Sequence, residues 1–476
     1  MSKDEKQSLS RMKPARQEER TKQLDLITTD KPVWFENGGK VSPEWLSQCK
    51  KERNQTSELL STIMETTNLF KAYRKVKQNG GSSGIDGQEV KEFGDWLQTN
   101  YQNIQTEVLT GNYTPQSVKG VEIPKPKGGT RLLGIPTVKD RVLQQAIQQI
   151  LQKQYDSKFS EHSYGFRPRR SAHQALLRAS EIVSQGKSIV IDLDLSKFFD
   201  KVNHRRLLWL LSTRIGDKRL LALISKILRS GILKGGMVEQ RTSGTPQGSP
   251  LSPLLSNIVL DELDQELTRR GLDFVRYADD VLIFTRRREN ASRISQSIVS
   301  FIETRMRLKV NRDKSGIRQC FEVNFLGHSL LKGGKLGLSK ESEQRLKSKV
   351  RKLTQRNKGV SIERVIKTLK TQLQGWLNYF RRASMSAKLR QLEGWIKRKL
   401  RCFRLKQCKR AIGIVRFLVK LKVKESLAWR LALSGKKWWR LSCSPACNIG
   451  MNNAWFDEMG YYSLTKNYKR PHRKPI

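Results

Sequence analysis

Two adjacent aspartates at the tip of an apolar hairpin constrain this chain more than any other feature. Residues 274–284 predict two short strands that reverse direction around Ala278 and Asp279. Neighbouring carboxylates repel each other, and a turn between buried strands withdraws them partly from water. A divalent cation would relieve that repulsion, and Mg²⁺ fits because it is a hard ion held by few carboxylates. The hairpin therefore predicts a metal-binding edge, although acidic pairs also occur in turns without such a role.

A further strand is predicted over residues 188–195, where apolar and acidic residues alternate. Its apolar face carries Ile189, Ile191, Leu193 and Leu195. Asp192 and Asp194 lie on the opposite face, and Asp194 is preferred as a third carboxylate because it is closer to the strand end. Three such acids on neighbouring strands predict a two-metal site for in-line displacement at phosphorus. The alternative is a strand-end acid that faces solvent.

Two other segments have features that suit phosphate binding. Residues 244–253, rich in Pro and Gly, open a helix predicted over 251–267, and a helix start offers backbone N–H groups to phosphate or a base pair. Gln247 in this loop has little reason to be there for packing, although a capped helix entry is the alternative. Lys125 and Arg131 flank a hairpin predicted over 121–135 and are candidates to bind a triphosphate; the alternative is two exposed cations.

The charge of the chain predicts a polyanionic partner. The 476 residues include 92 Lys and Arg against 44 Asp and Glu, a net charge of +48. Residues 341–440 alone carry 30 basic and 5 acidic residues, so the nucleic-acid surface is expected in the C-terminal half. A ribosomal-type or merely solvated basic protein is the alternative, but this chain is long and rich in apolar segments.

Cysteine usage and hydropathy predict a cytoplasmic protein. Of the six cysteines only Cys443 and Cys447 lie close together, so a structural zinc site is not expected and a reducing compartment is. The N-terminus is charged and lacks the apolar core of a signal peptide. No run approaches the ~18 apolar residues that span a bilayer, so no membrane partner is expected.

The remaining elements follow from periodicity. Helices are predicted over 59–76, 90–109, 140–155 and 171–184, and further strands near Phe325 and Leu336. From Glu341 onward the pattern is almost entirely helical and basic.

Taken together, the motifs resemble those of bacterial group II intron reverse transcriptases, the intron-encoded maturases. The resemblance runs from about residue 59 to the end, with the family's sequence blocks in order. These blocks are Gly-Ile-Asp-Gly at 84–87, Ile-Pro-Lys-Pro at 123–126, Thr-Arg-Leu-Leu-Gly-Ile-Pro at 130–136, Tyr-Gly-Phe-Arg-Pro at 164–168, Asp-Leu-Ser-Lys-Phe-Phe-Asp at 194–200, the Gly-Thr-Pro-Gln-Gly-Ser-Pro block at 244–257, Tyr-Ala-Asp-Asp at 277–280, Val-Asn-Arg-Asp-Lys-Ser at 310–315, Phe-Leu-Gly at 325–327 and Leu-Gln-Gly-Trp-Leu-Asn-Tyr-Phe-Arg at 373–381.

The resemblance implies an α+β fold, a right-hand polymerase with fingers, a palm built on an antiparallel sheet, and a helical thumb, plus a small helical C-terminal DNA-binding segment. The implied domains are a polar leader (1–58), an N-terminal extension of the fingers (59–115), the fingers and palm of the reverse transcriptase core (116–338), the thumb or maturase domain (339–410) and the DNA-binding segment (411–476).

The resemblance also implies roles for individual residues. Asp194, Asp279 and Asp280 would be the catalytic acids and, with the backbone oxygen of Leu195, would bind two Mg²⁺ ions that Mn²⁺ can replace. Phe199 would exclude a ribose 2′-hydroxyl, and Gln247 would lie near the new base pair. Lys125, Arg131 and Lys314 would bind the incoming nucleotide. The expected nucleic-acid contacts are Arg167, Arg381, Arg382, Lys397, Arg398 and Lys399.

The expected activity is RNA-directed DNA synthesis from a primer 3′-hydroxyl with dNTPs, combined with a maturase role in intron splicing and retrohoming. The expected partners are an RNA template, group II intron RNA and a DNA primer or target, in the bacterial cytosol or nucleoid. The paired cysteines and histidines of the family's optional endonuclease are missing, so second-strand cleavage is not expected, and the leader has no counterpart. The alternatives are a splicing cofactor with a vestigial polymerase, or a domesticated reverse transcriptase in DNA repair or phage defence.

Overall fold

The computed structural model describes residues 56–124 and 128–469, which divide into two compact units. The first comprises the described residues up to Arg178 together with Ile189–Arg318, and the second comprises Ala179–Ser188 and the described residues from Gln319 onward. Each unit has its own apolar core. Most of the expected leader, and the expected nucleotide-binding residue Lys125, lie outside the described residues.

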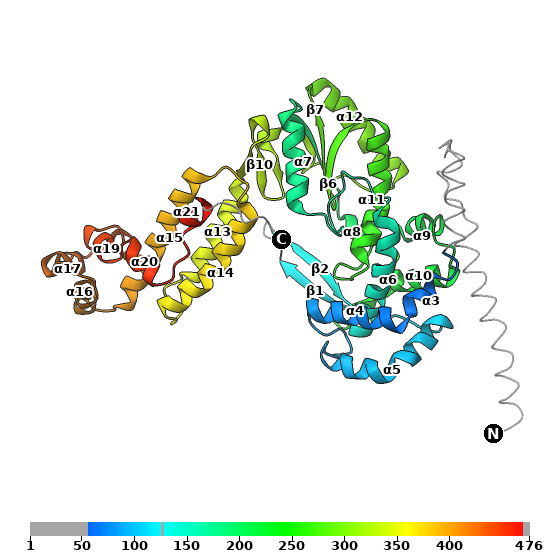
Figure 1. Cartoon of the computed structure of the whole chain (residues 1–476), viewed down its shortest axis with the longest axis horizontal. Helices are drawn as coiled ribbons and strands as arrows, with labels where there is room; N and C mark the ends of the chain where they lie inside the picture. The colour runs from blue at the N-terminus through cyan, green and yellow to red at the C-terminus, as the bar shows by residue number, and fades with distance from the viewer. Residues whose placement is uncertain (1–55, 125–127, 470–476) are drawn as a thin grey trace, which may run out of the picture. The chain divides into compact units, whose positions relative to one another are not determined.

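Helices make up most of the first unit (Figure 1). They are α3 (Leu59–Met64), α4 (Thr66–Asn79), α5 (Glu92–Leu109), α6 (Val138–Asp156), α8 (Phe198–Lys201), α9 (His204–Ser212), α10 (Lys218–Arg229), α11 (Ser252–Arg269) and α12 (Arg288–Ser300), with α7 (Ala172–Ser184) beginning in this unit.

The single helix expected over 59–76 is wrong, because the chain breaks at Glu65 into α3 and α4. Glu65 adopts an extended conformation, with φ −52° and ψ 138°. The side chain of Asn68 donates to the carbonyl of Ile63 at 2.7 Å, which satisfies a carbonyl at the end of α3. The other predicted helices of this unit are confirmed with ends shifted by at most two residues, whereas α8, α9, α10 and α12 were not predicted.

Two four-stranded sheets lie in the first unit. One has the order β6-β7-β3-β8, and the other β2-β1-β4-β5. Their strands are β1 (Val118–Pro124), β2 (Thr130–Ile135), β3 (Ile189–Asp194), β4 (Ile232–Lys234), β5 (Met237–Glu239), β6 (Asp273–Tyr277), β7 (Asp280–Thr285) and β8 (Gly316–Gln319). The hairpins predicted over 121–135 and 274–284 are confirmed as the antiparallel pairs β1–β2 and β6–β7, and the α+β class is confirmed with them.

The start of α6 is connected to the loop that precedes α11. Thr137 caps α6 by accepting from the backbone N–H of Asp140. One turn further on, the side chain of Gln144 accepts a buried hydrogen bond of 2.7 Å from the hydroxyl of Ser249. These contacts fix the Pro/Gly-rich loop, residues 244–253, against a core helix.

The second unit joins a small antiparallel sheet, β11-β10-β9, to a series of helices. Its elements are β9 (Asn324–Phe325), β10 (His328–Leu330), β11 (Leu336–Leu338), α13 (Lys340–Leu353), α14 (Ile362–Phe380), α15 (Ser386–Gln407), α16 (Ala411–Lys420), α17 (Glu425–Ala432), α18 (Trp438–Leu441), α19 (Pro445–Gly450), α20 (Asn453–Glu458) and α21 (Leu464–Lys469). The strands predicted near Phe325 and Leu336 and the helices from Glu341 are confirmed.

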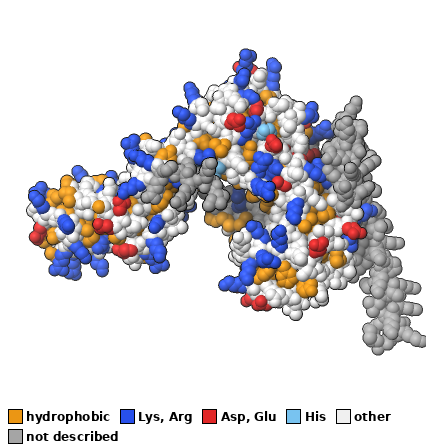
Figure 2. Space-filling model, viewed as in Figure 1, with side chains coloured by type: hydrophobic (Ala, Val, Ile, Leu, Met, Phe, Trp, Pro, Cys, Tyr) orange, Lys and Arg blue, Asp and Glu red, His pale blue; other side chains and the backbone are white. Residues whose placement is uncertain are grey.

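The surface of the second unit is strongly basic. Figure 2 shows Lys and Arg side chains distributed over its visible face, with few acidic side chains among them. The buried apolar residues of α14 and α15 form much of its core, which leaves the cations of these helices outside or at the core boundary. Within the described ranges, no helix is long and apolar enough to cross a bilayer.

Candidate active site

The sheet register brings Asp194 and Asp280 together. Asp194 is the direct partner of Asp280 in the β3–β7 pair, and Asp280 is in turn the partner of Tyr277 in the hairpin. Directly opposed residues of an antiparallel pair project from the same face of the sheet. The two acids predicted from separate stretches of sequence, 194 and 280, therefore share one face at one end of these strands.

Asp279 lies in the tight turn between β6 and β7. Ala278, which precedes it, has a positive φ of 58°, a conformation that an alanine adopts only at an energetic cost. Asp279 is half-buried, and Asp280 is the first residue of β7. The carboxylates of Asp279 and Asp280 therefore lie next to each other at the turn end of the β6–β7 hairpin.

Asp194 is held by the segment that precedes β8. Its carboxylate accepts from the side-chain amide of Asn311 at 2.9 Å and from the ammonium group of Lys314 at 3.2 Å. The hydroxyl of Ser315 accepts from the backbone N–H of Asp194 at 2.9 Å. Lys314 was predicted from the block at 310–315, whereas Asn311 and Ser315 in the same block were missed.

The competing acid, Asp192, has a different environment. It forms an ion pair with Arg318, and its partner across the sheet is Leu282 and not an acid. Asp194, by contrast, faces another carboxylate. The register therefore supports the choice of Asp194 over Asp192 as the third acid of the site.

Burial and neighbouring negative charges raise the pKa values of two carboxylates of this site, Asp279 and Asp280. Partial burial and the neighbouring charges of Asp279, Asp194 and Asp192 raise the pKa of Asp280 to about 7. Burial and the charge of Asp194 also raise the pKa of Asp279, and the cations Arg131 and Lys314 oppose that increase. A bound cation would stabilise the ionised form of these carboxylates, which burial and repulsion disfavour.

The oxygen ligands fit a hard divalent ion, but they are not yet arranged around one point. In the part of the chain that the structure describes, no three Asp, Glu, His or Cys side chains are already grouped as ion ligands. The contact between Lys314 and Asp194 gives a reason, since an ammonium group occupies one oxygen of that carboxylate. An ion bound at that oxygen would replace the contact to Lys314.

The Pro/Gly-rich loop brings two more predicted residues together. The amide of Gln247 donates to the carboxylate of Asp200 at 3.1 Å, and the backbone N–H of Thr245 donates to the carbonyl of Phe199 at 2.6 Å. Gly244 has a φ of +83°, and a Cβ there would lie 2.8 Å from the carbonyl oxygen of Asp200, so only glycine fits. Hydrogen bonds from the Pro/Gly-rich loop thus connect Gln247 to the segment that carries Phe199.

The other predicted residues of the core lie near the acids. Arg131 is exposed on β2, and its charge acts on Asp279. Leu195 is buried directly after β3 and forms an isolated antiparallel bridge with Val310.

The expected nucleic-acid contact at Arg167 is wrong. Its side chain is buried, with an ion pair of 2.9 Å to Asp156 and further donor bonds to the carbonyls of Ser160 and Ser163. A guanidinium that is used in this way stabilises the loop around it and does not present its donors to a phosphate.

Three of the cations expected on α15 also have intramolecular contacts. Lys397 forms an ion pair with Glu393 at 3.0 Å, and Arg398 stacks on Trp439 at 3.8 Å while donating to its carbonyl. Lys399 lies 5.0 Å from the centre of the same indole. All three side chains are half-buried. Arg398 and Lys399 pack α15 against α18, whereas Lys397 pairs within α15. Their expected role as nucleic-acid contacts stays a prediction.

Arg381 and Arg382 follow α14 and differ in exposure. Arg381 is half-buried and donates to the carbonyl of Asn467 at 3.1 Å, whereas Arg382 is exposed. Arg382 therefore stays a predicted nucleic-acid contact.

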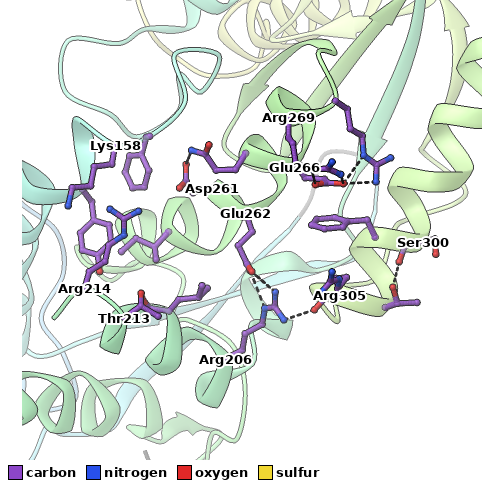
Figure 3. Close-up of a pocket in the computed structure, with 18 of the residues that line it drawn as sticks. Lys158, Arg206, Thr213, Arg214, Asp261, Glu262, Glu266, Arg269, Ser300 and Arg305 are labelled. Carbon is purple, nitrogen blue, oxygen red and sulfur yellow. Dashed lines mark hydrogen bonds and ion pairs between the residues drawn. The ribbon is translucent and has the colours of Figure 1, made fainter. Parts of the chain in front are cut away.

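A cavity of about 1070 Å³ lies elsewhere in the first unit, between α6, α9, α11 and α12. Figure 3 shows its charged side chains turned toward one another: Arg206 meets Glu262 at 2.6 Å, and Arg269 meets Glu266 at 2.8 Å. Asp261 also lines this cavity, and burial together with the charge of Asp264 raises its pKa to about 7.

The raised pKa of Asp261 predicts how the free energy of unfolding depends on pH. Between the ordinary carboxyl pKa and about 7 the folded chain retains a proton that the unfolded chain releases, so this group lowers stability as the pH rises through that interval. Asp261→Asn is therefore expected to be more stable than the parent by roughly 1–3 kcal/mol at pH 8 and nearly equal to it at pH 4. Urea unfolding at both pH values measures this, and an equal difference at both would contradict it.

Comparisons with known proteins agree with this geometry. Residues 123–330 match the family described as reverse transcriptase (RNA-dependent DNA polymerase), and residues 343–418 match the group II intron maturase-specific domain. Protein YkfC of Escherichia coli K12 is 32% identical over 315 residues, which are 58% of this chain and 83% of YkfC.

Two relatives have names that refer to introns. The group II intron-encoded protein LtrA of Lactococcus lactis is 35% identical over 210 residues, covering 44% of this chain and 34% of LtrA. The putative COX1/OXI3 intron 2 protein of Saccharomyces cerevisiae is 28% identical over 334 residues, covering 58% of this chain and 39% of that protein. This chain thus spans most of YkfC but little more than a third of either of these two proteins.

Proposed function

Because the chain belongs to the reverse transcriptases that carry a group II intron maturase domain, we propose that it extends a primer 3′-hydroxyl with dNTPs on an RNA template and assists the splicing and mobility of an intron. The observation that carries the polymerase proposal is the pairing of Asp194 with Asp280, beside Asp279, on one face of the sheet. Adjacent acids with raised pKa values in this position need a cation.

Enzymes of this family use divalent metal ions, and the oxygen ligands here suit Mg²⁺, with Mn²⁺ as a substitute. We propose that Asp194, Asp279, Asp280 and the backbone oxygen of Leu195 hold two such ions. When bound, they would lower the pKa of the primer hydroxyl and neutralise charge on the leaving pyrophosphate.

The other residues of the site have roles in binding and selection. Arg131 and Lys125 supply positive charge for the triphosphate, and Lys314 joins them once it is released from Asp194. Phe199 limits space at the sugar and so disfavours a ribose 2′-hydroxyl. Gln247, whose side-chain amide donates to Asp200, would contact the newly formed base pair.

The basic second unit supports a role in RNA binding. We propose that residues 339–410 act as the thumb and bind intron RNA, and that residues 411–476 bind target DNA, because this part of the chain combines dense positive charge with aromatic side chains. The bacterial relatives support the bacterial cytosol as the place of action.

Primer extension tests the polymerase proposal directly. The purified chain at low salt, with Mg²⁺, dNTPs and a primer annealed to an RNA template, is expected to extend the primer to the template end. Chelation of the divalent ions should stop synthesis, and renewed Mg²⁺ should restore it. A purified, folded chain that binds the primer–template but adds no nucleotide would refute the proposal.

A further inference from the structure

We propose that Arg276 is a positioning residue, which holds the turn that carries Asp279 from the core side of the sheet. Asp264 and Asn257 fix its guanidinium group. This inference rests on the proposed polymerase function for its consequence in catalysis, but its geometric content, the placing of the acids, does not depend on which reaction they perform.

The register places Arg276 behind the candidate active site. Its partner across the hairpin is Val281, whose own partner on β3 is Leu193, and both belong to the apolar core. Tyr277, Asp280 and Asp194 form the next row and project from the other face. An arginine in this position is unusual, since its side chain points into the core and is completely buried.

Each nitrogen of the guanidinium donates to a defined partner. Nε donates to Oδ1 of Asp264 at 2.7 Å, and Nη2 donates to Oδ2 of the same carboxylate at 2.5 Å. Nη1 donates to Oδ1 of Asn257 and to the carbonyl oxygen of Ala278, both at 3.0 Å. Asp264 and Asn257 are themselves completely buried on α11, so they cannot move without moving that helix.

The bond to Ala278 acts directly on the catalytic turn. The carbonyl of Ala278 and the N–H of Asp279 belong to one planar peptide group, so fixing the oxygen orients the backbone from which Asp279 projects. Ala278 also has a positive φ of 58°, which it would leave if nothing held it. The hydrogen bond from Arg276 therefore stabilises a conformation that the local sequence disfavours.

A second contact holds the turn from another side. The side-chain amide of Asn257 donates to the carbonyl of Gly165 at 2.9 Å. A Cβ on Gly165 would lie 2.3 Å from the backbone nitrogen of Ala278, so the two backbones are in direct contact. The backbone of Arg276 is bonded to the residues that precede Gly165. Its N–H donates to the carbonyl of His162, and its carbonyl accepts from the N–H of Tyr164, each at 2.9 Å. Arg276, Asn257 and Gly165 thus enclose the turn.

Stability alone does not account for the buried ion pair. Well-packed apolar side chains of similar volume often replace such pairs at no cost in stability. An apolar replacement here would fill the space but leave the carbonyl oxygen of Ala278 and Oδ1 of Asn257 without this donor. What only Arg276 supplies is the directed bond to the turn.

The experiment compares the double variant Arg276→Met/Asp264→Leu with the parent and a matched control. The control is Arg206→Met/Glu262→Leu, which removes another largely buried ion pair, between α9 and α11, that lines the cavity in Figure 3. Thermal unfolding and primer–template affinity are measured for each variant. Two further readouts report on the site: the single-turnover rate of primer extension, and the affinity for Mn²⁺ alone by electron paramagnetic resonance.

The turn variant is expected to fold and to bind primer–template like the parent, but to extend about a hundredfold more slowly and to bind Mn²⁺ about tenfold more weakly. The control should keep the parent's rate and Mn²⁺ affinity. A folded turn variant with parental Mn²⁺ affinity and parental extension would overturn the proposal.

Two outcomes need separate treatment. If the parent extends no primer, the polymerase proposal fails, and the Mn²⁺ affinities alone decide whether Arg276 places the acids. If the turn variant does not fold, Asn257→Ala decides, because it removes one partner of the guanidinium and leaves the ion pair. Weaker Mn²⁺ binding by Asn257→Ala supports the proposal, and parental binding overturns it.

Discussion

Replacement of Asp279 and Asp280 together by asparagine is expected to reduce primer extension by roughly a thousandfold or more, with RNA affinity unchanged. Asparagine keeps the volume of each side chain but removes the negative charge that would hold the metal ions. Burial and the repulsion between these carboxylates raise the pKa of Asp280 to about 7, and asparagine removes the charge that both disfavour, so the variant is not expected to lose stability.

The measurement combines single-turnover extension with filter binding of the same labelled RNA. Asp273→Asn is a matched control, because Asp273 begins the same hairpin at the end opposite the turn, where its partner is Phe284. This control should extend primers like the parent. Parallel loss of extension and RNA binding in the double variant would instead show that the acid pair supports the structure.

RNA binding by the parent is expected to weaken by roughly a thousandfold or more between about 50 and 200 mM monovalent salt, because each phosphate contact releases a counterion. Because residues 341–440 carry a net charge of +25, we expect most of these contacts in the second unit. Lys367 and Lys370 on α14 and Arg382 after it are exposed, and they are the side chains chosen to test this.

Substitution of these three residues by glutamine should weaken RNA binding and reduce the slope of log affinity against log salt by about two to three. The matched control carries Arg at 367 and 370 and Lys at 382, which keeps the charge and should keep the slope. A parent with a shallow slope would show that few phosphates are bound. An unchanged slope in the glutamine variant would place the contacts elsewhere.

The elements and acids that could be predicted from the sequence are those with local signals. The alternation over residues 188–195 and the apolar hairpin around Ala278 each specify a strand face, and the register then brings Asp194 to Asp280. The break at Glu65 could not be predicted in this way, because the apolar spacing continues through it. The spacing of leucines in α9 and α10 is a signal that could have identified both helices.

Pairing between distant residues is what the sequence does not reveal. Arg167 and Lys397 are as basic as any exposed residue, and only the fold shows that Asp156 and Glu393 neutralise them. Arg276 is the reverse case, since it stands beside the acid pair in sequence yet projects from the other face of the sheet. Its role depends on Asp264 and Asn257, which lie on α11. No local sequence pattern predicts these hydrogen bonds.

The close contact between Gly165 and Ala278 has a consequence for the working cycle. A polymerase must advance its product by one nucleotide after every addition, and some part of the complex has to move. Gly165, Asn257 and the guanidinium of Arg276 enclose the turn and restrict its movement. We therefore expect the acids to remain stationary through successive additions, so that translocation falls to the nucleic acid and to the surfaces that bind it.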